Sequence, residues 1–223
     1  MHLPHYNCLF IHIPKAAGNS IKHAFGIGWE DHKDIEKYRQ LLGERKLAQL
    51  FKFTFVRNPW DRVFSEYNFQ RRKSQRADTV RLYLYKEDGS ERSFREWVAF
   101  ALANPRLHPP NEWGGKPSEN IHRMSPQLDW IAGEDGLRVD FIGRLENMQE
   151  DFRKICLKVG LAPRRLKKRN RKLHLHYSRH YDEETKELVA NDYQKDIEAF
   201  GYEFEGIPKV ALEHAQPVNS TSG

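Results

Sequence analysis

Two short apolar runs that each lead into a helix constrain the fold of this chain more than any other feature. The run Cys8–Ile13 is followed by a turn over Lys15–Ser20 and then by a helix-like stretch. The run Phe51–Val56 is rich in residues that favour strands, and Asn58 with Pro59 after it is typical of a helix N-cap and first helical position. A strand, a loop and a helix in this order, found twice, predict parallel strands covered by helices.

The rest of the chain continues this alternation of helices and strands. After the second run, one apolar helix face is expected from the spacing of Trp60, Val63, Phe64 and Tyr67. Three further elements are expected, which are a helix capped by Ser93 that runs through Leu102, a strand at Val139–Gly143 and a helix at Asn147–Val159. A last helix is expected from Asp182 to the stop at Gly201. One stripe of this helix is apolar, and it contains Val189, Tyr193, Ile197 and Phe200. The pattern predicts an α/β fold with a mainly parallel sheet covered on both faces, whose ligands bind at the carboxyl ends of the strands.

The length of 223 residues and the composition fit one globular domain. We expect this domain to span residues 1–208, with residues 209–223 as a flexible tail. Hydrophobic residues (39%) and aromatic residues (12%) are too frequent for a disordered chain. No apolar run approaches the roughly 20 residues of a membrane helix, and the N-terminus lacks the pattern of a secretion signal, so we expect a cytoplasmic protein. The two cysteines, Cys8 and Cys156, form neither a metal-binding spacing nor a disulfide framework.

The positive charge of the chain is concentrated in two stretches. The net charge is +6, and the stretches Arg71–Arg76 and Arg164–Lys172 hold 4 and 7 basic residues with no acidic ones, so the rest of the chain carries −5. This concentration favours a polyanionic ligand such as a phosphorylated nucleotide or an acidic polysaccharide, and a solvated basic face is the alternative for each stretch. Nucleic acid is disfavoured because no exposed aromatic residues are interleaved with the basic ones.

The first junction, His12–Ser20 with the sequence HIPKAAGNS, has the composition of an anion-binding loop. Small residues let backbone N–H groups approach an anion at a helix N-terminus, and Lys15 adds a full positive charge. The loop differs from the P-loop of nucleoside triphosphatases, in which lysine follows the glycine and precedes a hydroxyl residue. The junction therefore predicts a phosphate cradle, with a plain tight turn as the alternative.

The second junction places an arginine at the end of a buried strand. Arg57 follows the run FKFTFV directly, and Ser65 lies two turns into the helix behind it. An arginine at the edge of a sheet can present its rigid fork to a phosphate as a bidentate donor. The alternative is a structural corner, in which Arg57 and Asp61 or Arg62 form salt bridges.

The two motifs together, HIPKAAGNS and then FKFTFVRNPWDRVFSEY, resemble a family of carbohydrate sulfotransferases, and in particular its sulfotransferase-2-type branch. Members of this family use the donor 3′-phosphoadenosine 5′-phosphosulfate (PAPS). The likeness covers about residues 8 to 204. Downstream it continues at Pro126-Gln127, Val139–Asn147, Tyr181–Thr185, Asp196-Ile197 and Phe200–Tyr202.

The resemblance implies a three-layer α/β/α fold with a P-loop-like phosphosulfate loop, PAPS as co-substrate and no metal. It assigns Arg57 and Ser65 to the 3′-phosphate of the donor. The 5′-phosphosulfate would be held by Pro14, Lys15, Ala16, Ala17, Gly18, Asn19 and Ser20. The chain departs from the usual family pattern at Ala16 and Asn19, where a threonine or a small hydroxyl residue is common, although the Asn19 amide can still donate a hydrogen bond.

The resemblance also implies an activity, which is sulfuryl transfer from PAPS to a hydroxyl of a carbohydrate or glycan-like acceptor, anionic glycans included. Such a transfer is an in-line displacement, in which Lys15 would stabilise the bridging oxygen as it leaves. A catalytically inactive nucleotide- or polyanion-binding module of the same fold is the alternative. A magnesium-dependent phosphotransferase is a more distant one.

The acceptor hydroxyl needs a general base, and histidine is the usual choice because its pKa lies near neutrality. His32 resembles the histidine that family members carry before the 3′-phosphate motif, and it is the first candidate. His122 is its rival. Further candidates are Glu66, Glu112 and His12.

Overall fold

The computed structural model describes residues 1–28, 32–73, 78–105, 121–133, 136–166 and 176–204. Its strands are β1 (His2–Leu3), β2 (Cys8–Ile11), β3 (Phe51–Val56), β4 (Ala132–Gly133), β5 (Gly136–Leu137) and β6 (Phe141–Arg144). Its α-helices are α1 (Gly18–Phe25), α2 (Ile35–Leu42), α3 (Glu44–Ala48), α4 (Pro59–Lys73), α5 (Asp78–Leu84), α6 (Phe94–Ala103), α7 (Met148–Lys158), α8 (Glu183–Asp192) and α9 (Gln194–Phe200). None of the helices in these ranges is long and apolar enough to cross a membrane.

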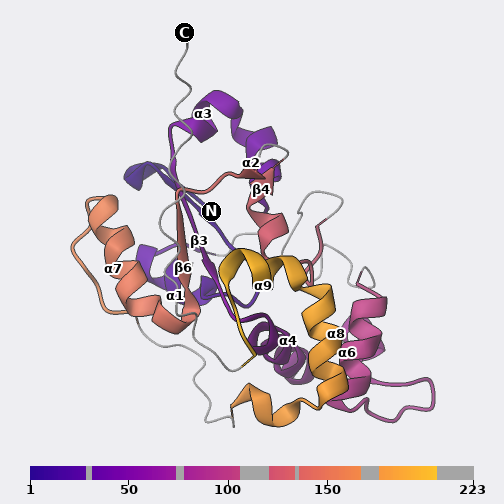
Figure 1. Cartoon of the computed structure of the whole chain (residues 1–223). Coiled ribbons are helices and arrows are strands. Elements are labelled where there is room, and N and C mark those ends of the chain that lie inside the picture. Colours follow the sequence, from indigo (N-terminus) through magenta and orange to yellow (C-terminus); the bar gives the residue numbers. More distant parts are fainter. Residues whose placement is uncertain (29–31, 74–77, 106–120, 134–135, 167–175, 205–223) are drawn as a thin grey trace.

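The central sheet has the strand order β1-β2-β3-β6, as Figure 1 shows in part. Strands β2, β3 and β6 run parallel, with Phe10 beside Phe53 and Phe53 beside Phe141, while β1 pairs with β2 in the antiparallel sense. The mainly parallel sheet predicted from the sequence is therefore confirmed. Because β2 and β3 are neighbours, the loops that follow them leave the same edge of the sheet side by side.

Helices cover both faces of this sheet, since the side chains of β2 alternate between two apolar cores. Leu9 and Ile11 belong to a core that contains Tyr38 of α2 and Phe200 of α9. Phe10, with Cys8, points into the other core, which α1 and α7 complete through Ile21, Phe152 and Ile155. In Figure 1, α7 and α9 accordingly lie on opposite sides of β6. The α/β/α arrangement of three layers is confirmed.

A third apolar core lies among helices and does not involve the sheet. The predicted apolar face of α4 is buried there, with Trp60 4% and Val63 1% exposed. Trp97 of α6 and Val189 of α8 pack into the same core, and Figure 1 shows these two helices side by side. Ser93 caps α6, as predicted, and together with Glu96 it forms a capping box. The long helix α4 therefore has one end at the sheet edge and its apolar face in this helical core.

The prediction of a single last helix from Asp182 to Gly201 was wrong. The chain forms two helices instead, α8 and α9, which meet at Tyr193. The Tyr193 ring is fully buried, and its hydroxyl donates a hydrogen bond to the Met124 carbonyl at 2.6 Å. The break brings the buried carboxylate of Asp196 to the backbone N–H groups of Gln127 and Leu128, at 2.7 and 2.8 Å.

Several predicted boundaries shift by a few residues. Strand β2 ends at Ile11 rather than Ile13, and α1 begins at Gly18 rather than Ser20. The strand expected at Val139–Gly143 is observed as β6, and the helix expected at Asn147–Val159 is observed as α7. These differences leave the order of elements unchanged.

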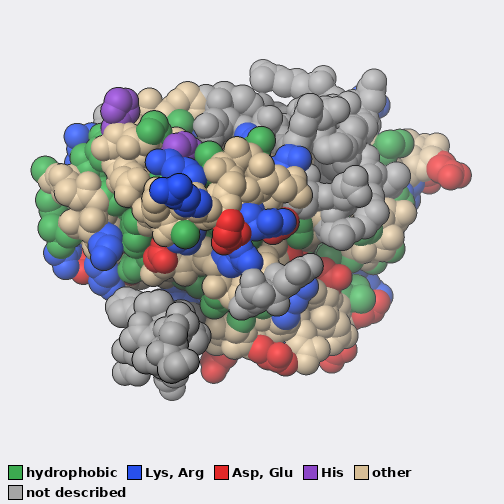
Figure 2. Space-filling view, turned by 90° about the horizontal axis from the view of Figure 1, so that it is seen from above, with side chains coloured by type: hydrophobic (Ala, Val, Ile, Leu, Met, Phe, Trp, Pro, Cys, Tyr) green, Lys and Arg blue, Asp and Glu red, His purple; other side chains and the backbone are tan. Residues whose placement is uncertain are grey.

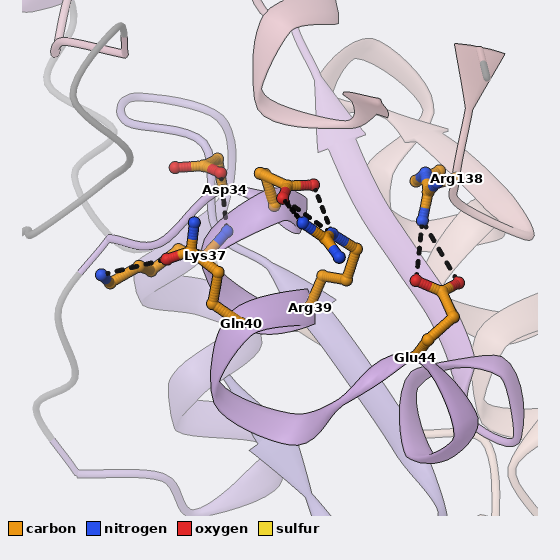
Figure 3. Close-up of polar contacts among 7 residues, drawn as sticks. Asp34, Lys37, Arg39, Gln40, Glu44 and Arg138 are labelled. Carbon is orange, nitrogen blue, oxygen red and sulfur yellow. Dashed lines mark hydrogen bonds and ion pairs between the residues drawn. The ribbon is translucent and has the colours of Figure 1, made fainter. Parts of the chain in front are cut away.

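The segment between the two junctions forms α2 and α3, which the sequence patterns did not predict. The Asp34 side chain caps α2 by accepting a hydrogen bond from the Lys37 N–H at 2.9 Å, and Figure 3 shows this cap. The ion pair between Glu44 and Arg138 (3.2 Å) joins α3 to the segment between β5 and β6. Exposed ion pairs of this kind add little stability. Helix α2 is therefore held on the sheet by its apolar contacts.

Most of the two predicted basic stretches lies outside the described residues, and so does the expected tail at 209–223. Of the second stretch, Arg164 and Arg165 are exposed, whereas Leu166 is buried in the core beneath α7. Figure 2 shows one face of the molecule, on which basic side chains stand in separate groups with acidic side chains between them.

Candidate functional site

The loop between β2 and α1 has an unusual backbone. Lys15 and Ala17 both adopt left-handed conformations, with φ of 66° and 63°, which is uncommon for residues other than glycine. Ala17 is the N-cap residue of α1, and no side chain in the described ranges caps this helix. A loop of this shape turns its N–H groups toward one concave side, and a helix N-terminus adds its positive dipole. The two left-handed residues and the helix N-terminus fit the predicted phosphate cradle, which stays a prediction.

Gly18 is required in this loop by a close contact with His12. A Cβ atom built on Gly18 would lie 1.6 Å from Nε2 of the His12 ring, which is far inside any allowed contact. His12 itself is buried at the end of β2 and stacks on Phe10, at a centroid distance of 5.7 Å. The glycine thus lets an imidazole pack directly beneath the start of α1.

We predict that Gly18→Ala destabilises the protein, because the added methyl group must displace the buried His12 ring. Overpacking of this kind costs about 1–3 kcal/mol, which corresponds to a fall of roughly 2–4 °C in Tm for each kcal/mol. The matched control is Gly28→Ala, since a Cβ on Gly28 meets no atom within 4 Å. Thermal unfolding of both variants checks this prediction. An equal Tm for the two variants would contradict it.

Arg57 connects the second junction to the first. Its Nη1 donates to the Lys15 carbonyl oxygen at 3.3 Å, so the two loops touch. Its Nε and Nη2 hold the carboxylate of Asp61, each at 2.7 Å. The structural corner that the sequence left open is therefore present. It leaves Arg57 at the sheet edge with 16% of its side chain exposed, and Ser65 lies half-buried two turns further along α4.

The backbone of Arg57 is fixed by a distant glutamine. The Gln127 amide accepts a hydrogen bond from the Arg57 N–H (2.9 Å) and donates one to the Arg57 carbonyl (2.8 Å). Asp196 in turn holds Gln127, so α9 supports the end of β3. Gln127 and Asp196 are among the residues that carry the family resemblance. In the structure Gln127 fixes the backbone of Arg57, and Asp196 holds Gln127.

Arg62 is a second connector, which the sequence suggested only as a member of a salt-bridged corner with Arg57 and Asp61. Its side chain is buried, and its guanidinium donates to three backbone carbonyls. These belong to Pro14 in the first loop (3.1 Å), Ser125 (3.0 Å) and Arg123 (2.9 Å). Arg62 therefore binds the segment after residue 120 to the anion-binding loop. No sequence pattern indicated this role.

Lys15 extends into a largely buried place beside α4. Its ammonium group lies 4.3 Å from the ring centroid of Phe69, and Arg123 lies over the same ring at 4.9 Å. Arg123 also forms an ion pair with the buried carboxylate of Glu66, at 2.6 Å. Burial lowers the pKa of Lys15 to about 7, an effect that Glu66 opposes and Arg123, Arg57 and Arg72 reinforce. Lys15 is thus a poorly solvated cation, which an anionic ligand would bind strongly.

His32 packs against His12, with ring centroids 4.0 Å apart and the two rings tilted by 43°. Its Nδ1 is 2.8 Å from the His12 carbonyl oxygen, which can only accept a hydrogen bond. Nδ1 must therefore carry the hydrogen, and Nε2 is left with the lone pair of a base. Burial, followed by the positive charge of Arg123, lowers the pKa of His32 to about 3. The same burial lowers the pKa of His12 well below its usual value.

His122 and Glu112 are further candidates for the base. His122 precedes Arg123 in a turn, where its N–H donates to the Ser125 hydroxyl at 2.9 Å. Glu112 lies outside the described residues. Within the described ranges, no group of three or more His, Cys, Asp or Glu side chains could hold a metal ion. Sequence reasoning missed Phe69 and Arg123, because nothing in the pattern showed that they meet Lys15.

The site thus combines the loop that is predicted to bind an anion, a half-buried lysine and an arginine at the carboxyl ends of two adjacent parallel strands. A family model described as the sulfotransferase family matches residues 1–203, which include every residue of this site. None of the curated proteins matches the sequence significantly. Since the family model covers most of the 223 residues, the chain belongs to the sulfotransferase family.

Proposed function

We propose that the protein transfers a sulfuryl group from PAPS to a hydroxyl of a carbohydrate acceptor. The contact between Arg57 Nη1 and the Lys15 carbonyl carries this proposal, because it places an arginine guanidinium beside the first loop at one edge of the sheet. Asp61 holds the Nε and Nη2 side of this guanidinium. PAPS has two anionic ends, the 5′-phosphosulfate and the 3′-phosphate. A site with two neighbouring anion-binding elements matches such a donor, and the sulfotransferase family generally uses it.

In this proposal the first loop, Pro14–Ser20, binds the 5′-phosphosulfate through Lys15 and the backbone N–H groups at the start of α1. Pro14 has no N–H group, and the buried Ala16 already donates its N–H to the Ile13 carbonyl at 3.3 Å. Asn19 is exposed on the first turn of α1 and can donate from its amide. Arg57 and Ser65 receive the 3′-phosphate. Asp61 fixes the orientation of the Arg57 guanidinium through the two hydrogen-bonding contacts described above.

The transfer itself is an in-line displacement at sulfur. The bond between sulfur and the bridging oxygen breaks while a bond to the acceptor oxygen forms, and the acceptor proton moves to the general base. Lys15 stabilises the negative charge that develops on the bridging oxygen. His32 is proposed as the base, because its Nε2 carries the lone pair, and His122 remains the rival.

The carbohydrate acceptor rests on the resemblance to carbohydrate sulfotransferases, and the concentrated basic residues favour an anionic glycan. A second candidate function is a PAPS- or polyanion-binding module without catalysis. The pKa of about 3 for His32 favours this second candidate, because so weak a base accepts a proton poorly.

The proposal predicts that the product adenosine 3′,5′-bisphosphate binds the protein and raises its Tm by linkage. Isothermal titration calorimetry measures the binding, and transfer from labelled PAPS is then assayed against a panel of glycans, glycolipids and small alcohols. Absence of binding at millimolar bisphosphate would refute the proposed function. Binding without turnover on the whole panel would support the binding module instead.

A further inference from the structure

Two cations share one aromatic ring at the centre of the site. Lys15 and Arg123 lie 4.3 and 4.9 Å from the centroid of the Phe69 ring. Lys15 belongs to the loop after β2, and Arg123 belongs to the segment that Arg62 joins to this loop. Glu66, one turn before Phe69 on α4, is 2% exposed and binds Nε of Arg123 at 2.6 Å. The cluster therefore holds two positive charges and one carboxylate in a largely dehydrated place.

This cluster is costly for a protein without a ligand. A buried ion pair adds little net stability, since both charges lose their hydration. Among the residues that the structure describes, no ion pair joins Lys15 to a carboxylate, and the burial of Lys15 lowers its pKa. An anion placed between the two cations would compensate this unfavourable arrangement. The cluster is thus better explained by ligand binding than by folding stability.

The position of Arg123 is fixed from three directions. Its carbonyl accepts a hydrogen bond from Arg62 (2.9 Å), which also binds the Pro14 carbonyl, so Arg123 and the anion-binding loop share one anchor. Its guanidinium is held by Glu66 and by the Phe69 ring. Behind Glu66, the Gln70 amide donates to Oε1 of Glu66 at 3.3 Å. Such support is what a catalytic cation needs, because a small displacement would weaken its contact with the reacting group.

We infer that Arg123 is a second cation of the transfer site, which binds non-bridging sulfonate oxygens of the donor, and that Glu66 is the positioning residue that holds it. This inference rests on the proposed function. Lys15 would serve the bridging oxygen, while the planar fork of Arg123 suits the oxygens of the sulfonate. Because Lys15 would act on the bridging oxygen and Arg123 on the non-bridging oxygens, the site needs both cations, and this accounts for their meeting at the Phe69 ring.

The test compares PAPS with adenosine 3′,5′-bisphosphate, which lacks the sulfonate. For Arg123→Met, calorimetry should show the Kd of PAPS rising about tenfold while the Kd of the bisphosphate changes by less than about threefold. Arg123→Lys should recover part of the PAPS affinity, because it restores the charge without the fork. The matched control is Arg153→Met on α7, where the arginine forms an exposed ion pair with Glu150.

Glu66→Gln tests the positioning role by a readout that packing alone would not change. Among the described residues, the charged groups with the largest effects on Lys15 are Glu66, Arg123, Arg57 and Arg72, and of these four Glu66 alone raises the pKa of Lys15. The glutamine keeps the size and an acceptor oxygen but removes the charge. The alkaline decline in kcat, which needs the protonated Lys15, should therefore shift to lower pH in Glu66→Gln.

Each outcome separates this inference from the proposed function. If the wild-type protein binds neither PAPS nor the bisphosphate, the proposed function itself fails. If the wild type binds both and Arg123→Met changes the two Kd values equally, or changes neither, Arg123 does not bind the sulfonate. If Arg123→Met does not fold, Arg123→Lys decides: a loss confined to PAPS supports the inference, and an unchanged ratio of Kd values overturns it.

Discussion

Lys15→Met is expected to lower kcat for sulfuryl transfer by about 10²–10³-fold, with a much smaller effect on the Kd of adenosine 3′,5′-bisphosphate. The reason is that the proposed work of Lys15 is on the bridging oxygen, whose negative charge grows only as the bond to sulfur breaks. Methionine keeps the apolar stem against Phe69, on which the Lys15 ammonium group lies at 4.3 Å. Steady-state kinetics and calorimetry on the same preparations measure the two effects.

The lowered pKa of Lys15 gives this variant a second, independent signature. In the folded protein the pKa is about 7, against an ordinary value of 10.5, so the unfolded chain binds more protons between these two pH values. This residue therefore makes the stability of the ligand-free protein rise with pH across that window. Lys15→Met should raise Tm most below pH 7, and the gain should disappear near pH 10.5.

The matched control is Lys158→Met. Lys158 also lies over an aromatic ring, that of Phe51 at 5.9 Å, but it is exposed on α7. Its replacement should leave kcat unchanged and give no such dependence of Tm on pH. Equal losses of bisphosphate affinity in Lys15→Met and Arg57→Ala would show that the two junctions do not divide binding and catalysis as proposed.

The sheet and its two junctions could be predicted from the sequence because they rest on local patterns. Strand β3 was predicted at its observed bounds from the run FKFTFV, and the Asn58 side chain accepts the expected cap hydrogen bond from the Trp60 N–H at 3.1 Å. A buried parallel strand is apolar along its whole length, so it is visible without any knowledge of its neighbours. The short helices α2 and α3 lack such a signal, and they were missed.

The support of the site could not be predicted, because it depends on polar side chains that are far apart in the sequence. Glu66 meets Arg123 over 57 residues, and Arg57 meets Gln127 over 70. Apolar periodicity places helices and strands, but it does not show which polar groups meet between them. The break at Tyr193 was missed for the same reason, since the contact of its hydroxyl with Met124 lies in the tertiary structure.

The burial of His32 is another property that the sequence did not reveal, and it changes the pH dependence expected for catalysis. His32→Ala is expected to lower kcat by about 10²–10⁴-fold and to leave bisphosphate binding nearly intact. A histidine base must be neutral, so activity is lost as pH falls through its pKa. In the free protein this pKa is about 3, because burial and then Arg123 disfavour the imidazolium.

The anionic donor should raise the pKa of His32 in the complex, since its negative charge offsets that of Arg123. The acid limb of kcat, which reports the complex, should therefore lie at higher pH than the acid limb of kcat/KM, which reports the free enzyme. Both limbs should be absent in His32→Ala. His23→Ala, an exposed position on α1, is the matched control and should behave as the wild type.

His122→Ala separates the two histidine candidates. It should reduce kcat less than His32→Ala does, because His122 lies in the turn before Arg123 and is not the residue that packs against His12. If His122→Ala abolishes turnover while His32→Ala stays active, the two assignments must be exchanged. If both variants stay active, the proton passes to a carboxylate. Glu66 is then the first to test, since it is the buried carboxylate whose charge acts on Lys15.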